Sequence, residues 1–555
     1  MNANIKAVAP AAAPQAKSGQ SAKNASDDLK SRKSEELLIA LSGPVGCGIP
    51  SVRESLTKVL EKRGYQVVHV KVSSTFEALA SNLHLEIKDD AESDNHEFVR
   101  IWRSQSIGNA LRLKLGDDMG AQLAIKAISV DRTAKHSGVP IPEIKPGKIA
   151  YLIDQLKHPR EVALLRSIYD NMFYLVGVLS GFNQRKNELS SKMPEDLAVR
   201  LMHRDRAETH SAKGVSDNAG QQLEKTLKLA DFFISNSQRS MGLLKGPIER
   251  FVGLIHGDTG LTPTTKECGM FAAYSAALKS ACLSRQVGAA IVDRHGNIIS
   301  TGCNDVPRAG GGLYDVSNGK NDFRCINKAG LCFNDKYKDE LRDQIESVLR
   351  KAGINEASLL KTEIKDSVSA IAEKVKKNTR IKDLIEFSRA VHAEMDAIIQ
   401  SARKGNPSIQ GSFLFTTTYP CHSCARHIVA AGIRAVYFIE PYEKSLAIEL
   451  HEDAIDHDPA SGDADWSSDK PFKKVAFLHF EGVAPMRFTS LFNALDGRKD
   501  ESGRMVENPG GTNMKRSTEY LDDYKVLEAR VLERLENLSS PAIEDQPTPD
   551  QPIVA

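Results

Sequence analysis

Buried strands and amphipathic helices alternate along the first half of the chain, after a start without any hydrophobic period. Residues 1–34 are rich in Ala, Pro, Ser and Lys, so we predict a disordered tail there. An apolar run at 36–43 predicts a buried strand, the pattern at 52–64 an amphipathic helix, and 65–73 a second strand. A strand, a glycine-rich turn, a helix and a strand open many phosphate-binding α/β domains, and we expect such a domain over residues 35–245.

The glycine-rich turn has the outer spacing of a phosphate-binding loop but not its charge. Gly43 and Gly48 are spaced as in G-x-x-x-x-G, with Gly46 between them, yet Ile and Pro occupy 49–50 where Lys and Ser or Thr are expected. Ser51 comes one place late. Backbone N–H groups of the loop can still bind a phosphate, whereas transfer of a phosphoryl group is not expected without the Lys. The alternative is that the glycines only turn the chain.

Further segments match a P-loop-kinase-like domain. The apolar run 148–159 predicts a strand that ends at Asp154, placed like a Walker B acid, and 171–180 and 229–236 predict two more buried strands. The Arg-rich stretch from Arg200 to Glu208 resembles the lid of small-molecule kinases. Residues 100–128 are strongly helical, with one apolar face for packing.

A turn-rich boundary at 240–265 precedes a second α/β region, which we predict to be an α/β/α domain over 262–500. It begins with a helix, a strand, a turn at 295–297 and a strand. Apolar residues at Val391, Met395 and 398–399 have a helical period, and 411–421 predicts a buried strand followed by a helix. Residues 474–494 predict a strand, loop and helix at a further edge of this domain. A C-terminal amphipathic helix is expected at 515–538 and a disordered acidic tail at 539–555.

Composition and charge exclude few functions, but they indicate which partners and which cellular compartment to expect. The chain of 555 residues is 41% hydrophobic and 26% charged, with a net charge of +2, so neither nucleic acid nor a membrane is demanded as a partner. Its 8 Cys are scattered, which favours a reducing compartment. Without an 18-residue apolar run or a signal-peptide pattern, we expect a cytoplasmic protein that does not contact membranes.

The central motif is H-x-E followed by P-C-x-x-C. His392 and Glu394 lie near one helix start, and Cys421 and Cys424 share the first turn of another, where the helix dipole favours thiolates. One imidazole and two thiolates bind Zn²⁺ and leave its fourth position open, as in catalytic rather than structural sites. Glu394 is then the candidate proton carrier. A structural zinc knuckle is the alternative, although it would not need the H-x-E pattern.

This motif is the signature of zinc-dependent nucleobase deaminases, and the preceding segment resembles the deoxycytidylate deaminase family. The resemblance rests on Ser284, the strand 287–292 and the Gly302, Asn304, Pro307 and Gly310 loop. It implies deamination of deoxycytidine nucleotides at a Zn²⁺ site. It also implies that Asn304 contacts the sugar and base edge, with Ser284, Arg285 and Tyr442 nearby and Lys444 available for phosphate.

An insertion at about 313–385 departs from the simple family pattern. It is polar, mostly helical after Asp335, and stands between the substrate loop and the zinc helix, so it is a candidate to cover the site or to mediate assembly. Cys325 and Cys332 lie seven apart within it. They are either free thiols or part of a second zinc site.

The order of the two domains resembles bacterial antiphage deoxycytidylate deaminases over residues 35–500. That resemblance implies dCTP and dCMP depletion during phage infection, a homo-oligomer, a regulatory nucleotide at the N-terminal domain, and an inhibited state kept by RNA or another partner. Three alternatives remain: a housekeeping dCMP deaminase with a regulatory extension, a polynucleotide editor, and a zinc-containing nucleotide sensor. An editor is disfavoured because aromatic residues make up only 6% and no basic run flanks the motif.

Overall fold

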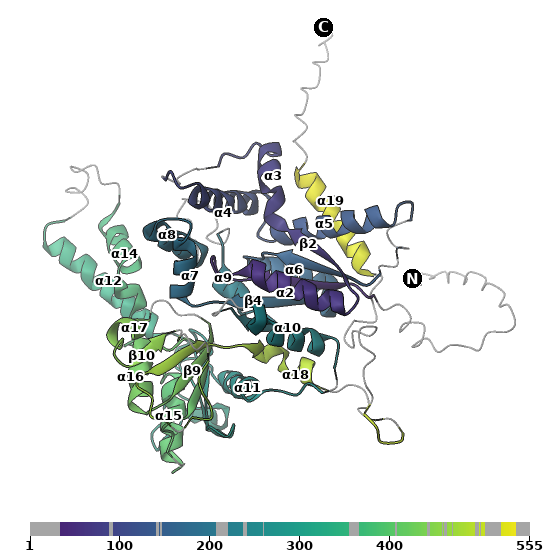
Figure 1. Cartoon of the computed structure of the whole chain (residues 1–555). Helices are drawn as coiled ribbons and strands as arrows, with labels where there is room; N and C mark the ends of the chain where they lie inside the picture. Colours follow the sequence, from purple (N-terminus) through teal and green to yellow (C-terminus); the bar gives the residue numbers. More distant parts are fainter. Residues whose placement is uncertain are drawn as a thin grey trace, which may run out of the picture.

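Two six-stranded sheets form the centres of two adjoining α/β units in the part of the chain that the computed structural model describes (Figure 1). The described residues are 34–87, 93–139, 144, 147–206, 220–236, 241–258, 260–354, 366–405, 408–440, 445–457, 459, 463–468, 470–493, 499, 501–505 and 523–539. Of the two expected tails, 1–34 and 539–555, only the inner ends Ser34 and Ser539 are described.

The N-terminal sheet has the order β12-β5-β4-β1-β3-β2, and its neighbours from β5 to β2 are parallel. Its central strand β1 is buried along its whole length, as its apolar sequence predicts. The strands of this sheet are β1 (Leu37–Ser42), β2 (Gln66–Lys71), β3 (Ile149–Asp154), β4 (Phe173–Leu179), β5 (Phe232–Ser235) and β12 (Gly482–Val483). The strands expected from the N-terminal hydrophobic runs are therefore confirmed.

Helices cover both faces of this sheet (Figure 1). Asn95 caps α4 by accepting a hydrogen bond from the Phe98 amide, and Pro50 occupies the first turn of α2, where a missing N–H costs nothing. The helices are α2 (Ile49–Lys62), α3 (Phe76–Asn82), α4 (His96–Leu115), α5 (Met119–Lys135), α6 (Pro159–Tyr169), α7 (Phe182–Ser190), α8 (Glu195–Arg206), α9 (Leu223–Leu227) and α10 (Met241–Ile255). The expected Arg-rich lid is described only up to Arg206, within α8.

The second sheet is mixed, with the order β10-β11-β9-β8-β6-β7. β6 runs antiparallel to both of its neighbours, and the strands from β8 to β10 are parallel. The strands are β6 (Gly288–Val292), β7 (Ile298–Cys303), β8 (Phe413–Thr418), β9 (Ala435–Glu440), β10 (Ile455–His457) and β11 (Val475–His479). Its helices are α11 (Thr265–Ala277), α15 (Ala393–Arg403), α16 (His422–Ala430) and α17 (Ala447–Leu450). The mixed α/β fold class is confirmed.

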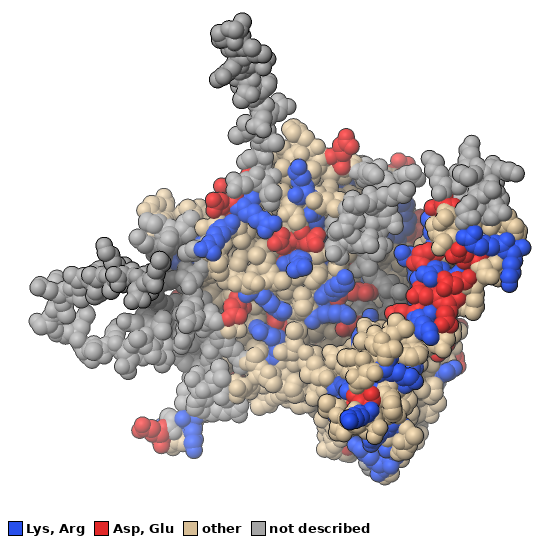
Figure 2. All heavy atoms as spheres, turned by 180° about the vertical axis from the view of Figure 1, so that it is seen from behind, with Lys and Arg blue, Asp and Glu red and all other residues tan. Residues whose placement is uncertain are grey.

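The insertion forms a projecting lobe of two antiparallel helices, α12 (Phe333–Lys351) and α14 (Val368–Asn378). Opposite charges alternate over this lobe, which Figure 2 shows from behind, and Lys376 forms ion pairs with Asp339 and Glu373. The Lys376–Asp339 pair joins α14 to α12, whereas the Lys376–Glu373 pair lies within α14. Across the helices of the described part, none is both long and apolar enough to cross a membrane.

The C-terminal region returns to the N-terminal sheet, which the sequence did not indicate. β11 joins the second sheet as expected, but β12 pairs antiparallel with β5 of the first sheet, followed by α18 (Phe488–Phe492). The expectation that the whole of 474–494 lies at the edge of the second domain is therefore wrong for β12. Of the predicted helix 515–538, residues 515–522 lie outside the described residues, and α19 (Asp523–Ser539) contacts α5 and α6 of the N-terminal unit.

A buried ionic cluster holds α19 in place. Arg132 of α5 donates to Glu36 at 2.9–3.0 Å and to Glu528 of α19 at 2.6 and 3.2 Å, and all three side chains are at most 1% exposed. Tyr169 and Tyr524 donate to the two carboxylates. Every charge in the cluster is hydrogen-bonded, which is the condition for a buried ion pair to be tolerated.

We expect Glu528→Ala to destabilise the protein by about 3–5 kcal/mol, because it removes one of the two carboxylates that neutralise a buried guanidinium. Thermal unfolding and hydrogen exchange of the α19 amides measure the loss. Glu533→Ala removes an exposed carboxylate from the same helix and is the matched control, with a change within about 0.5 kcal/mol. Equal stability of the two variants would contradict the role of the cluster.

Candidate active site

The three predicted metal ligands meet at the starts of two helices. His392 directly precedes α15, and Cys421 is the N-cap residue of α16, which also carries Cys424. His392 Nδ1 lies 3.3 Å from each Sγ, and the three ligand atoms lie within 4.8 Å of one another. Because Zn²⁺ holds thiolate sulfur at about 2.3 Å and imidazole nitrogen at about 2.0 Å, this spacing and donor set fit zinc.

Two close contacts with glycine set the position of α15. A Cβ at Gly302 of β7 would lie 2.3 Å from the Ala393 carbonyl and from the Ala397 amide, so only glycine permits this approach of helix and strand. Asp396 of α15 accepts a hydrogen bond from the Cys303 amide, and Ser300 donates to the Ala397 carbonyl. β7 thereby fixes the first turn of α15, which carries Glu394.

Glu394 is buried, at 4% exposure, with its Oε2 3.5 Å from Cys424 Sγ. Burial raises the pKa of this carboxyl above its ordinary value. A raised pKa makes this carboxyl a better proton acceptor than a free one, as a general acid and base requires. The structure therefore brings the predicted proton carrier to the predicted metal ligands.

The environment also favours a thiolate at Cys421. Its sulfur accepts hydrogen bonds from Cys424, including the Cys424 amide at 3.4 Å, and lies beside His392. These contacts lower the pKa of Cys421 to about 4, and the same thiolate raises the pKa of Cys424 and of His392. The position at a helix N-terminus acts in the same direction for Cys421.

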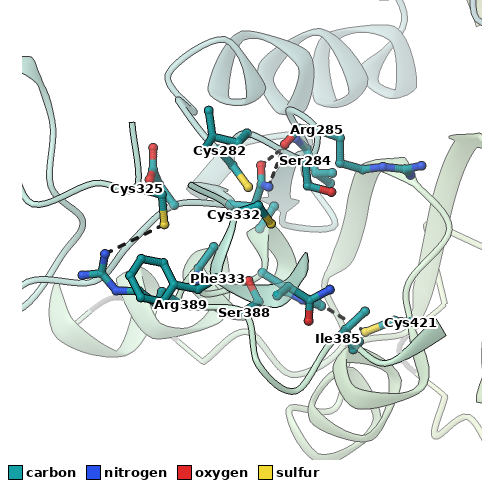
Figure 3. A pocket seen from close by; sticks show the side chains of 18 of the residues that line it. Cys282, Ser284, Arg285, Cys325, Cys332, Phe333, Ile385, Ser388, Arg389 and Cys421 are labelled. Atoms are coloured by element: carbon teal, nitrogen blue, oxygen red, sulfur yellow. Dashed lines mark hydrogen bonds between the residues drawn. The ribbon is translucent and has the colours of Figure 1, made fainter. Parts of the chain in front are cut away.

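A pocket of about 360 Å³ opens over this centre (Figure 3). The walls come from the 282–287 loop, the end of β7, the insertion and the starts of the two zinc-motif helices. Cationic groups on these walls are Arg285, Lys338, Lys382 and Arg389. The carboxyls of Glu224, Asp305, Asp335 and Glu394 line the pocket as well, so an anionic group of a small ligand would have to contact the cationic side chains.

Asn304 lines the pocket and also shapes it. Its Oδ1 accepts from the Val287 amide at 2.7 Å, and its Nδ2 donates to the Arg285 carbonyl at 2.8 Å. The amide therefore holds the 285–287 loop against the pocket while retaining one N–H for a ligand. Ser284 and Arg285 line the same pocket, as expected for substrate contacts, and Arg285 lies 3.8 Å from Glu440.

The insertion forms one wall of the pocket. Phe333 at the start of α12, Ile385 and Arg389 face it, and Arg389 donates to the Phe323 carbonyl and contacts Cys325 Sγ at 3.8 Å (Figure 3). Of the two roles considered for the insertion, covering the site is the one that this arrangement favours. Among the described residues, the group suited to a metal comprises the zinc-motif ligands and includes neither Cys325 nor Cys332. A second zinc site at these cysteines is not supported.

Some lining residues were not found from the sequence, and two expected ones are not placed. Glu224 of α9 lines the pocket although it belongs to the N-terminal unit, and nothing in its local sequence marks it. Lys338 and Lys382 belong to the insertion, whose sequence shows only a polar helical pattern. Tyr442 and Lys444 lie outside the described residues.

The N-terminal glycine loop borders a separate pocket of about 390 Å³, which Gly46, Gly48, Lys71, Asp154 and Lys157 help to line. Gly48 has φ of 80°, and a Cβ there would lie 2.2 Å from Asn236 Nδ2, so the turn requires glycine. Neither Gly43 nor Ser51 is among the residues lining this pocket, and their role as phosphate contacts stays a prediction. Asp154 pairs with Arg53 of α2 at 2.6 Å.

A protein carboxylate contacts the loop where a phosphate was expected. Asp205 of α8 accepts the Val45 amide at 2.6 Å, and its other oxygen accepts from Lys157 Nζ at 2.7 Å. Lys157 also donates to the Gly43 carbonyl, so it brings to the loop the positive charge that position 49 lacks. The ion pair between Asp205 and Lys157 thus contacts the loop at the Val45 amide and at the Gly43 carbonyl.

Comparison with known proteins places the site in a family. Residues 263–440 match the model of the cytidine and deoxycytidylate deaminase zinc-binding region. The deoxycytidylate deaminase of Enterobacteria phage T2 is 31% identical over 175 residues, 31% of this chain and 78% of that protein. That of phage T4 is 30% identical over 173 residues, 31% of this chain and 76% of the relative.

One further relative and one solved structure match different lengths of this chain. The ComE operon protein 2 of Bacillus subtilis is 43% identical over 68 residues, 12% of this chain and 35% of its own length. The crystal structure of the dCMP deaminase from cyanophage S-TIM5 in apo form matches 39% of this chain and 100% of its own, with 19% identity and a TM-score of 0.20. Global similarity this low adds nothing to the sheet topology described above.

Proposed function

The chain belongs to the cytidine and deoxycytidylate deaminase family, and we propose that it hydrolyses deoxycytidine nucleotides, dCMP and dCTP, to the deoxyuridine nucleotides and ammonia. As a member of that family it is a zinc-dependent deaminase. The observation that carries the proposal is a buried carboxyl, Glu394, beside a His/Cys/Cys metal centre in a pocket with cationic walls.

His392, Cys421 and Cys424 would hold the metal, which when bound supplies a hydroxide nucleophile near neutral pH by lowering the pKa of water. Glu394 would take a proton from the attacking water and deliver it to ring N3 as the C4 centre becomes tetrahedral. It would then carry the proton of the hydroxyl added at C4 to the amino group, which leaves as ammonia. Water and cytosine thus give uracil and ammonia.

The pocket walls support a nucleotide rather than a polynucleotide as substrate. Arg285, Lys338, Lys382 and Arg389 offer positive charge for phosphates, and Asn304 offers an amide N–H. The insertion walls the pocket on one side, so a nucleic acid strand has less room to pass across the site than a single nucleotide has to enter. A polynucleotide editor is therefore the less favoured alternative.

The experiment offers cytidine, dCMP, dCTP, CTP and a single-stranded oligodeoxynucleotide to purified zinc-loaded protein and quantifies the uracil product of each. We expect dCMP and dCTP to be turned over with the highest kcat/KM. Deamination confined to the oligonucleotide would overturn the proposal, and equal rates on ribo- and deoxyribonucleotides would remove its specificity for the deoxy sugar.

We expect Asn304→Ala to lower kcat/KM for dCMP about 10- to 100-fold, equivalent to about 1–3 kcal/mol, without loss of zinc. The variant loses both a ligand N–H and the support of the 285–287 loop. Asn297→Ala, in the exposed turn before β7, removes the same side chain away from the pocket and serves as the control. Unchanged kinetics for Asn304→Ala would place the amide outside substrate recognition.

We also propose that the N-terminal loop binds a regulatory nucleotide without hydrolysing it. The pocket beside the loop, its backbone turn and Lys157 support binding, and the absent Lys at position 49 argues against phosphoryl transfer. Asp205 must then leave the Val45 amide when a phosphate arrives. A nucleotide regulates only to the extent that it binds active and inactive states differently.

Asp205→Asn should tighten binding of ATP or dTTP by about tenfold, or about 1.4 kcal/mol, because it removes a competing negative charge at nearly constant size. Calorimetry measures both affinities. Asp196→Asn, on the exposed face of the same helix, is the control. If neither wild type nor Asp205→Asn binds either nucleotide at about 1 mM, the loop is architectural.

Because the chain resembles antiphage deaminases, we extend the proposal to infected cells. There a homo-oligomer of this chain depletes the dCTP pool, and RNA or another partner inhibits the homo-oligomer. What supports this is the order of the two α/β units. The test measures the dCTP concentration of infected cells with and without active protein. A housekeeping dCMP deaminase would not lower that concentration upon infection.

A further inference from the structure

A second cavity, of about 340 Å³, lies where the two α/β units meet. Leu179, Phe182 and Leu227 of the N-terminal unit form one side, and Tyr419, Phe438 and Ile448 form the other. It is mainly lined by apolar and aromatic groups, and it is separate from both the catalytic pocket and the pocket beside the glycine loop. Its size is within the range of small-molecule sites.

Three buried polar atoms of residues that line this cavity have no hydrogen-bond partner. They are the hydroxyl of Tyr419, whose side chain belongs to a residue only 6% exposed, and the Nδ1 atoms of His457 and His479. Buried polar atoms in folded proteins are nearly always paired, because an unpaired one loses its hydration without compensation. Three such atoms belong to residues that line one cavity, so a ligand there that reached them would provide the missing partners.

The rings around these atoms show what kind of ligand fits. Phe438 contacts both imidazoles, with ring centroids 6.4 Å from His457 and 4.5 Å from His479, and Tyr419 meets His457 edge-on at 5.6 Å. Burial lowers the pKa of His457 to about 4 and that of His479 to about 3, so both imidazoles are neutral at physiological pH. Each Nδ1 then donates or accepts according to its tautomer.

The charged groups at the cavity are few, and its arginine is already engaged. Arg185 donates to the Ser180 carbonyl and lies 5.9 Å from the Phe182 ring. Glu224 and Glu449, on opposite sides, add negative rather than positive charge. A phosphate would therefore lack a cationic cradle here, whereas a flat uncharged ring with a hydrogen-bonding edge would stack on aromatic faces and pair with the three atoms.

We propose that this cavity binds a neutral, planar heteroaromatic molecule of nucleobase or nucleoside size, and that its occupancy is transmitted to the deaminase centre. The link is Tyr419, which lines both the cavity and the catalytic pocket and stands two residues before the ligand Cys421. Glu224 lines both spaces as well, from the N-terminal unit. A ligand held between the units thus contacts elements that shape the catalytic pocket, and coupling of the two sites must be reciprocal.

Calorimetric titration of the zinc-loaded full chain with adenosine, thymidine and uridine tests the binding step, with saturating dUMP present to block the catalytic pocket. We expect at least one nucleoside to bind with a stoichiometry near one and a Kd below about 100 μM. His457→Phe keeps a flat ring but removes Nδ1, and should weaken that binding at least about tenfold. His295→Phe, at an exposed turn, removes an imidazole elsewhere and should leave the Kd unchanged.

Leu227→Trp fills the cavity from the opposite side and should abolish binding; circular dichroism and zinc content establish that it is folded. The nucleoside that binds should change kcat/KM for dCMP at least twofold in wild type and leave it unchanged in Leu227→Trp. The proposal is overturned if none of the three nucleosides binds wild type, or if the bound one binds both cavity variants as tightly as wild type. The heat of binding, measured with and without dUMP, stands apart from whether dCMP is the substrate, whereas the kinetic readout rests on the proposed function.

Discussion

Glu394→Gln should retain zinc and lose deamination by about 10²- to 10⁴-fold in kcat, the share usually due to a positioned acid and base. The amide keeps the size of the side chain within a fully packed first turn of α15 but can neither take a proton from water nor deliver one to ring N3. Metal analysis and steady-state kinetics with dCMP measure the two effects. Substrate binding should change little, since Gln keeps the size of the side chain and the other lining residues are untouched.

Glu452→Gln makes the same change at an exposed position outside the pocket and should behave as wild type. Undiminished turnover by a zinc-loaded Glu394→Gln protein would show that another group moves the protons, and the mechanism would fail.

Cys421→Ala and Cys424→Ala should each lower zinc affinity by more than about 100-fold and remove activity with it, because only three residues of this group hold the metal. Both should also lower stability, since ligation contributes to folding. Cys421→Ala should be the less stable, because it further loses the N-cap contact from its sulfur to the Cys424 amide, worth about 1 kcal/mol.

Zinc content by emission spectroscopy and thermal unfolding with and without a chelator measure these losses. Cys268→Ala, on α11 away from the pocket, is the matched control and should retain one zinc. Stoichiometric zinc in either ligand variant would mean that the ligand is assigned wrongly.

The zinc centre could be predicted from sequence because each of its parts is local. H-x-E and P-C-x-x-C fix their own positions at two helix starts, and the apolar runs before and after them define the strands that carry those helices. Hydrophobic periodicity and motif spacing were therefore enough to predict the metal ligands and Glu394.

The remainder of the site depends on contacts between distant segments, which no local pattern records. Glu224 reaches the pocket from the other unit, and Arg389 from the end of the insertion. The return of β12 to β5 and the docking of α19 through Glu528 likewise pair residues more than 200 positions apart. Asp205 at the glycine loop belongs to this class, because only the fold brings α8 to Val45.

The most direct test of the central claim is a zinc titration of metal-free protein with dCMP and dCTP deamination as the readout. The account predicts no uracil product without metal and a linear rise that ends at one zinc per chain. Full deamination by the metal-free protein, or none at one zinc per chain with either nucleotide, would contradict it.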